Sequence, residues 1–75
     1  NQKEFMNGIY QSIILANDDH DEEWLMGLYA TLADRDGVSY SITNLAQYAV
    51  EEEKFLDTSD ELISLLKKDL GLSEF

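Results

Sequence analysis

Apolar residues recur along this chain at the spacing of amphipathic helices. In the first segment they fill two adjacent columns that repeat every four residues: Phe5, Met6, Ile9, Tyr10, Ile13 and Ile14. Lys3, Asn7 and Gln11 fall on the opposite side. The pattern predicts a helix with one buried stripe, in which Gly8 marks a point of reduced helix propensity.

A second stripe of the same kind follows an acidic stretch. Its apolar members are Trp24, Leu25, Leu28, Tyr29, Leu32 and Ala33. The carboxylates of residues 21–23 meet the positive end of this helix's dipole, and Asp19 or His20 is expected near its cap. Residues 34–37 predict the end of the helix, because Gly37 is free to adopt a positive φ.

Two further helices are expected in the second half of the chain. The third is expected to start with Ser41 as its N-cap and to end near residues 54–56. Its buried stripe is Ile42, Leu45, Ala46, Ala49 and Val50. Thr58 and Glu61 have the spacing of a capping box, so the fourth helix is expected to begin there and to close at Gly71. Its interior positions are Leu62, Ile63, Leu65, Leu66 and Leu70.

The four stripes predict an all-α fold, a small bundle of about four short helices forming one acidic domain over residues 1–75. A chain of this length has room for one core. No apolar run approaches the roughly 18 residues of a membrane span, so we expect a soluble, cytoplasmic protein. The first residue is Asn rather than Met, which we interpret as processing or excision from a longer chain. Beyond Gly71, we expect Leu72 and Phe75 to fold back on the bundle or to contact another subunit.

The net charge of the chain limits which classes of partner are expected. Sixteen Asp and Glu against five Lys and Arg give a formal net charge of −11. Such a chain repels polyanions, so nucleic acids and anionic membranes are disfavoured as partners. At 44% hydrophobic residues it can nevertheless bury a core, which argues against disorder. The acidity therefore indicates either a protein partner with a basic surface or a need for solubility alone.

The sequence contains no constellation of residues typical of catalysis or of metal binding. His20 is the only histidine, and no nucleophile elbow, P-loop or His-Glu-x-x-His motif occurs. A calcium loop counted from Asn17 has Glu22 at its sixth position and Leu28 at its twelfth, where glycine and glutamate are required. With no cysteine, there is neither a disulfide nor a thiolate metal site. We expect no enzymatic activity, no cofactor and no metal.

A short motif joins the second and third expected helices. Ala33 is followed four residues later by Gly37, and residues 38–41 then supply an aliphatic residue and two serines for a helix cap. On these terms residues 29–48 resemble the helix-turn-helix unit of phage-repressor-like DNA-binding proteins. The resemblance implies that the following residues face the major groove: Tyr40, Ser41, Asn44 and Gln47.

The sequence departs from that family in three ways. Asp36 stands where an apolar residue is usual, and Thr43 stands where an aliphatic core residue is expected. The recognition helix would carry no Lys or Arg before Lys54, while it does carry Glu51 to Glu53. We therefore rank DNA binding below protein contact.

We predict a small acidic protein–protein interaction module, an adaptor or inhibitor whose size fits a bacterial or phage accessory protein. A helix-turn-helix regulator is the alternative. An acidic DNA mimic is a second alternative, because carboxylates spaced along a helix lie about 5–6 Å apart, as phosphates do. The oligomeric state is left open.

The candidate partner-binding residues are acidic groups without a clear local role, with two neighbours on the third helix. They are Asp18, Asp19, Asp34, Asp36, Gln47, Tyr48, Glu51, Glu52 and Glu53. Glu51 to Glu53 lie toward a helix C-terminus, where the dipole disfavours negative charge. Tyr48 falls off the buried stripe and is therefore expected to be exposed.

Overall fold

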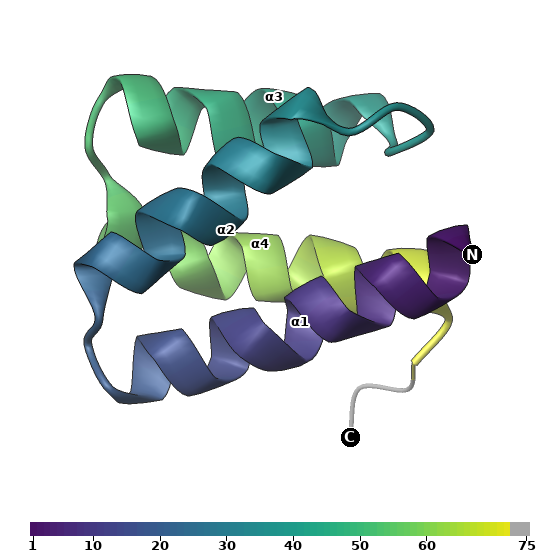
Figure 1. Ribbon diagram of the computed structural model, residues 1–75, viewed down its shortest axis with the longest axis horizontal. Helices are drawn as coiled ribbons and strands as arrows, with labels where there is room; N and C mark the ends of the chain where they lie inside the picture. Colours follow the sequence, from purple (N-terminus) through teal and green to yellow (C-terminus); the bar gives the residue numbers. More distant parts are fainter. Residues whose placement is uncertain (73–75) are drawn as a thin grey trace.

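Four α-helices make up the computed structural model, which describes residues 1–72 of the chain (Figure 1). They are α1 (Gln2–Asp18), α2 (Glu22–Asp34), α3 (Tyr40–Glu51) and α4 (Phe55–Leu70). α2 and α4 contact each other and separate α1 from α3, and each of them packs on both outer helices. Residues 1–72 contain no strand, so the predicted all-α single domain is confirmed. Phe75 lies outside the described residues, and Leu72 is exposed.

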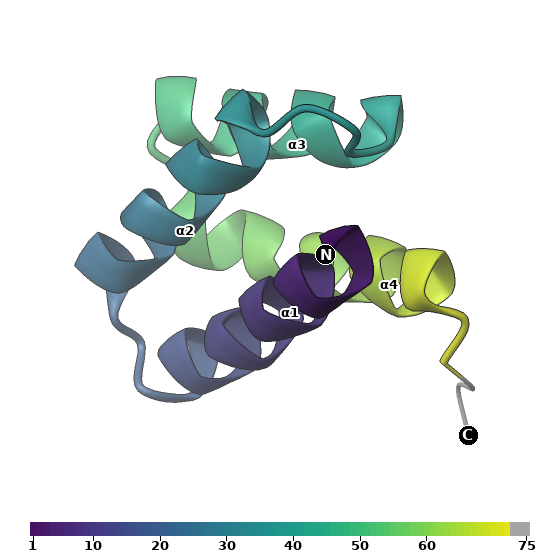
Figure 2. The same cartoon turned by 45° about the vertical axis from the view of Figure 1, so that its right-hand side comes forward.

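The chain path places the two tight turns at one end of the molecule. The α1–α2 and α3–α4 turns lie together at the left of Figures 1 and 2, whereas the α2–α3 loop lies at the other end. The acidic stretches 18–23 and 51–53 therefore share an end, which we call the acidic end. Within residues 1–72, no helix combines the length and the apolar character that crossing a bilayer requires.

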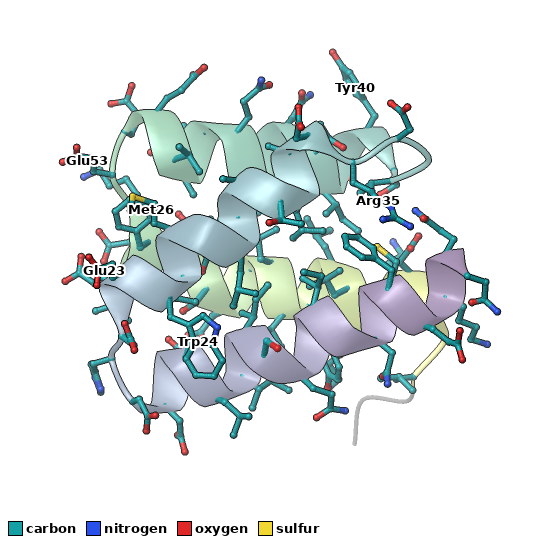
Figure 3. The ribbon with its side chains drawn as sticks, in the orientation of Figure 1. Glu23, Trp24, Met26, Arg35, Tyr40 and Glu53 are labelled. Carbon is teal, nitrogen blue, oxygen red and sulfur yellow. The ribbon has the colours of Figure 1, made fainter. Side chains whose placement is uncertain are left out.

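The core draws on all four helices, and most of it lies on the predicted stripes. Its buried members are Met6, Ile9, Ile13, Ala16, Leu25, Tyr29, Leu32, Ile42, Ala46, Ala49, Phe55, Leu62 and Leu66. The expected burial of Trp24 is wrong, since its side chain is 38% exposed. Trp24 lies in the first turn of α2 at the edge of the stripe, and Figure 3 shows its ring projecting toward α1 on the outside of the bundle.

Buried polar groups fix the start of α4 against α1 and α2. The Tyr29 hydroxyl donates to the Phe55 carbonyl at 2.8 Å, and the two ring centroids lie 6.4 Å apart. The Ser59 hydroxyl lies 2.6 Å from Asn17 Oδ1 and 2.8 Å from the Leu56 carbonyl. These contacts satisfy polar atoms that would be costly to leave unpaired in the core.

The start of α4 corrects the sequence prediction. The helix begins at Phe55 and not at Thr58, so the predicted Thr58–Glu61 capping box is wrong. Lys54 occupies the N-cap position without a side-chain hydrogen bond, and Thr58 is buried inside the helix. The Phe55 ring is buried and its carbonyl accepts a hydrogen bond from Tyr29. These contacts stabilise residues 55–57 as an additional first turn of the helix and outweigh the local capping signal.

The starts of α2 and α3 also differ slightly from prediction. Asp21 caps α2, and its carboxylate accepts the Trp24 N–H at 3.0 Å. Asp19 and His20, which were expected near this cap, form the turn that ends α1. Ser39 rather than Ser41 is the N-cap of α3, so that helix begins two residues early.

Three helices end in the same hydrogen-bonded turn. In α1, α3 and α4 a left-handed residue is followed by an N–H that donates to the carbonyl five residues earlier, at 2.9 Å in each case. The left-handed residues are His20 (φ 54°), Glu53 (φ 55°) and Gly71 (φ 74°), and only Gly71 is a glycine, as predicted. A side chain in this conformation costs about 1–2 kcal/mol. Two of the three turns therefore hold stored strain.

Gly37 confirms the predicted left-handed turn, with φ 86°. A Cβ atom at this position would lie 3.3 Å from Gln2 Nε2. We expect Gly37→Ala to lower the free energy of unfolding by about 1–2 kcal/mol, because both the backbone and the space oppose a side chain. Urea denaturation measures the change. The control is Gly8→Ala, where nothing lies within 4 Å and alanine should stabilise the helix; equal stability of the two variants would contradict the prediction.

Burial raises the pKa of the Tyr29 hydroxyl well above its ordinary range, and nearby Asp60 adds to the effect. Above about pH 10 the unfolded chain loses this proton while the folded chain keeps it, so stability falls as pH rises, by roughly 1 kcal/mol per pH unit. We expect Tyr29→Phe to lack this contribution. Urea denaturation between about pH 9 and about pH 11 compares the two proteins. Identical pH slopes would refute the assignment.

Candidate functional site

The predicted partner-binding residues are all exposed, but they do not form one surface. Asp18 and Asp19 lie at the acidic end with residues 51–53. Asp36 lies in the α2–α3 loop at the opposite end of the molecule. Asp34 is the last residue of α2, two positions before Asp36, whereas Gln47 and Tyr48 lie about one turn before the end of α3. A single partner contact would therefore use a subset of these residues.

The glutamates 51–53 occupy an unfavourable position for carboxylates. They form the last residue of α3 and the turn after it, where the helix dipole is negative. Glu53 is in addition left-handed, and the turn is held by the Lys54 N–H, which donates to the Ala49 carbonyl at 2.9 Å. Sequence reasoning found the charge conflict, whereas the backbone strain emerges only from the structure. The turn combines two separate energetic costs at one exposed place.

Replacing Glu53 with glycine should relieve the backbone strain and remove one of the three carboxylates that oppose the helix dipole. We expect Glu53→Gly to raise the free energy of unfolding by about 1 kcal/mol or more, measured by urea denaturation. His20→Gly is the matched control, because it relieves the same backbone conformation without removing a carboxylate. A larger gain at Glu53 than at His20 measures the charge contribution. If neither variant raised the free energy of unfolding, the left-handed residues would not be strained.

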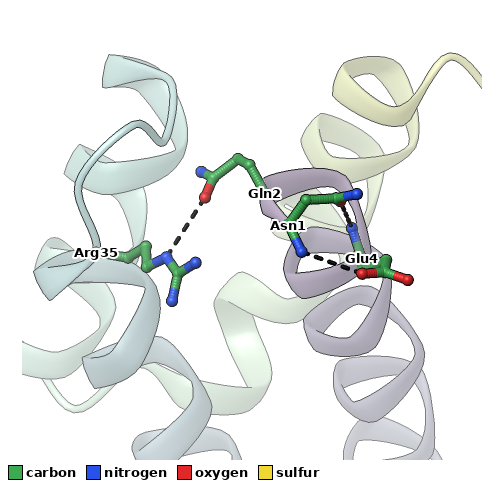
Figure 4. Close-up of polar contacts among 4 residues, drawn as sticks. All are labelled: Asn1, Gln2, Glu4 and Arg35. Atoms are coloured by element: carbon green, nitrogen blue, oxygen red, sulfur yellow. Dashed lines mark hydrogen bonds and ion pairs between the residues drawn. The ribbon is translucent and has the colours of Figure 1, made fainter.

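Apart from Glu4, the carboxylates of residues 1–72 form no ion pair. Within residues 1–72, the ion pair formed is that of the terminal ammonium with Glu4, at 3.0 Å (Figure 4). Arg35 stands between two aspartates in sequence, but its guanidinium lies 4.0 Å from the centre of the Phe5 ring. Its Nε donates to Gln2 Oε1 at 3.4 Å. Arg35 thus joins α2 to α1 and leaves the neighbouring carboxylates unneutralised.

Small side chains open a groove between the second half of α2 and α3. Its volume is about 430 Å³, and it is lined by Ala30, Ala33, Asp34, Gln47, Val50 and Glu51. Three of these residues were predicted as partner contacts from their charge or exposure: Asp34, Gln47 and Glu51. The alanines and Val50 were missed. A signal for the alanines exists in the sequence, because this edge of α2 carries no bulky residue at positions 30 and 33.

The outer face of α3 is aromatic and polar. Tyr40 and Tyr48, two turns apart, are 81% and 49% exposed, which confirms the expected exposure of Tyr48. Asn44 and Gln47 are exposed between them, and Glu51 follows at the C-terminal end of the same face. The helix-turn-helix resemblance implies base reading by this face, yet no cation lies on it.

Large exposed apolar side chains also escaped the sequence prediction. Met26 is 42% exposed on α2, and Figure 3 shows it at the acidic end with Glu23 and Glu53. The 3.6-residue period places Met26 just outside the buried stripe, which is the signal that could have found it. The acidic end therefore combines carboxylates with an apolar contact residue.

Residues 1–72 contain no cluster of three or more His, Asp or Glu side chains placed to hold a metal ion. Comparisons with protein-family models, curated proteins and solved structures find no match. Function is therefore inferred from the geometry and charge of the exposed residues.

Proposed function

We propose that this chain is a non-catalytic protein–protein interaction module that binds a protein with a basic surface through its acidic end. The observation that carries the proposal is the turn formed by residues 51–53, where exposed carboxylates oppose the helix dipole and Glu53 is left-handed. Together these features cost about 1–3 kcal/mol, a sizeable share of the stability of so small a domain. A binding function explains why glutamate occupies a place where glycine would be more stable.

This part of the surface offers both the charge and the apolar area that a specific protein contact requires. Unpaired carboxylates steer a basic partner and raise its association rate more than its final affinity. Met26 at this end, and Tyr48 on α3 three residues before Glu51, offer exposed apolar area that excludes water on contact. A module of this kind acts stoichiometrically, as an adaptor or inhibitor does.

Capture from a lysate of the native cells tests the proposal. The immobilised chain is expected to retain a basic protein at low salt and to release it at high salt, with mass spectrometry identifying that protein. The variant in which residues 51–53 are all glutamine is the comparison, and it should retain less of the same protein. Failure to capture any protein in a salt-sensitive way would overturn the proposal.

A DNA-binding regulator is the second candidate. It is supported by the left-handed Gly37 and by the exposed Asn44 and Gln47 on α3. This candidate predicts a gel shift with duplex DNA that weakens with salt and with Asn44→Ala or Gln47→Ala. Absence of any shift at low salt would end it.

DNA mimicry is a special case of the proposed protein binding. If the carboxylates occupy a partner's DNA-binding surface, duplex DNA and this chain must compete for the captured protein. Displacement by duplex DNA supports mimicry. A ternary complex of all three components refutes mimicry and leaves protein binding in place.

A further inference from the structure

We infer that the groove between α2 and α3 receives an arginine side chain of the partner. The inference rests on the proposed function and names the chemical group that is recognised. The groove is about 430 Å³ in volume, and small or β-branched apolar residues form part of its lining: Ala30, Ala33 and Val50. Such a surface suits the methylene stem of a long cationic side chain, which buries its stem while its charged head remains at the edge.

The polar residues of the groove match the head group. Asp34 on α2 and Glu51 on α3 supply two carboxylates from different helices, and Gln47 adds an amide oxygen. A guanidinium carries five N–H donors in a rigid planar fork, so it can meet several acceptors at once. An ammonium group is a compact point charge with three donors and fits such a spread of acceptors less well. Arginine is therefore the occupant that the groove favours.

The chain's own cations leave this groove free. Arg35 adjoins Asp34 in sequence, but its guanidinium is held over Phe5 and its Nε is bonded to Gln2. Figure 3 shows Arg35 on the side of α2 that faces α1. An adjoining hollow is lined by Ala30, Thr31, Asp34 and Arg35, so it shares Ala30 and Asp34 with the groove. Two other hollows each include a lysine beside a carboxylate, Lys3 with Glu4 and Lys68 with Asp69. The α2–α3 groove lacks such an internal cation and is electrostatically complementary to an external one.

A matched pair of leucine variants tests the groove without altering charge. Ala30→Leu fills it from an exposed position, and Gln11→Leu adds the same side chain to the exposed side of α1. We expect Ala30→Leu to weaken binding of the captured partner at least about tenfold, while Gln11→Leu binds as the unmodified chain does. Circular dichroism checks that both variants fold. If Ala30→Leu binds normally while the 51–53 glutamine variant loses binding, the groove assignment is wrong and the proposed function stands.

A peptide titration followed by amide NMR shifts identifies the occupant directly. The probes are blocked glycine–serine pentapeptides with one central arginine, lysine or citrulline. We expect the arginine peptide to shift amides of the groove residues: Ala30, Ala33, Asp34, Gln47, Val50 and Glu51. The lysine peptide should bind more weakly, and the uncharged citrulline peptide should cause no saturable shift. Equal shifts with all three peptides, or shifts confined to residues 18–23 and 52–53, would overturn the inference; loss of salt-sensitive partner capture would instead overturn the proposed function.

Discussion

Replacing Tyr29 with alanine is expected to remove about 3–5 kcal/mol from the free energy of unfolding. The Tyr29 ring is fully buried and lies against Phe55 at the point where α4 begins. Its loss leaves a cavity and also removes the hydroxyl that donates to the Phe55 carbonyl. A 75-residue domain has a total stability of only about 4–11 kcal/mol, so this variant should be partly unfolded at 25 °C.

Tyr29→Phe separates packing from hydrogen bonding at the same position. It keeps the ring and should cost only about 1–2 kcal/mol, because the hydroxyl alone is lost. Urea denaturation followed by circular dichroism measures both variants. If the alanine variant lost no more stability than the phenylalanine variant, the ring would not be the structural link between α2 and α4 that its contacts indicate.

Neutralising the glutamates of residues 51–53 as glutamines is expected to have the largest effect on binding. Association with the captured basic partner should slow by about tenfold or more at low salt, while dissociation changes less, because unpaired exposed charges act mainly on the encounter. The folded domain should become more stable at the same time, since three negative charges leave the end of α3. Slower association in a more stable protein excludes unfolding as the cause.

The control for this variant has the same net charge. Asp60→Asn, Glu61→Gln and Asp69→Asn together remove three exposed negative charges from α4. If the effect belongs to the surface around residues 51–53, this triple variant should keep most of the association rate. Equal slowing by both variants would assign the effect to net charge alone, and the acidic end would lose its special role. Surface plasmon resonance or stopped-flow mixing measures the rates.

The helical stripes could be predicted because apolar residues recur along the sequence with the 3.6-residue period of an α-helix. Ile13, Leu25 and Leu66 lie on predicted stripes and are completely buried. The start of α4 could not be predicted in the same way. Thr58 and Glu61 have the local pattern of a cap, but the tertiary contact between Tyr29 and Phe55 extends the helix beyond it. Tertiary packing overrides local propensity where the two disagree.

The candidate site, too, could be predicted from the sequence only in its local features. The conflict between Glu51 to Glu53 and the helix dipole is local, so the sequence reveals it. The arrangement of the charges is not local: Asp36 proves remote from the acidic end, while Asp34 and Glu51 line one groove. Which helices pack together decides both results, and that packing depends on contacts between residues far apart in the chain.

The dissociation constant of the captured partner, measured by calorimetry across a range of salt concentrations, tests the proposed function most directly. For the unmodified chain we expect affinity to fall by at least about tenfold between low and high salt, because exposed charges are screened over about 10 Å at 0.1 M ionic strength. The variant with glutamine at residues 51–53 should show a clearly smaller dependence. An affinity that stays constant over the same range, in both proteins, would contradict electrostatic recognition through the acidic end.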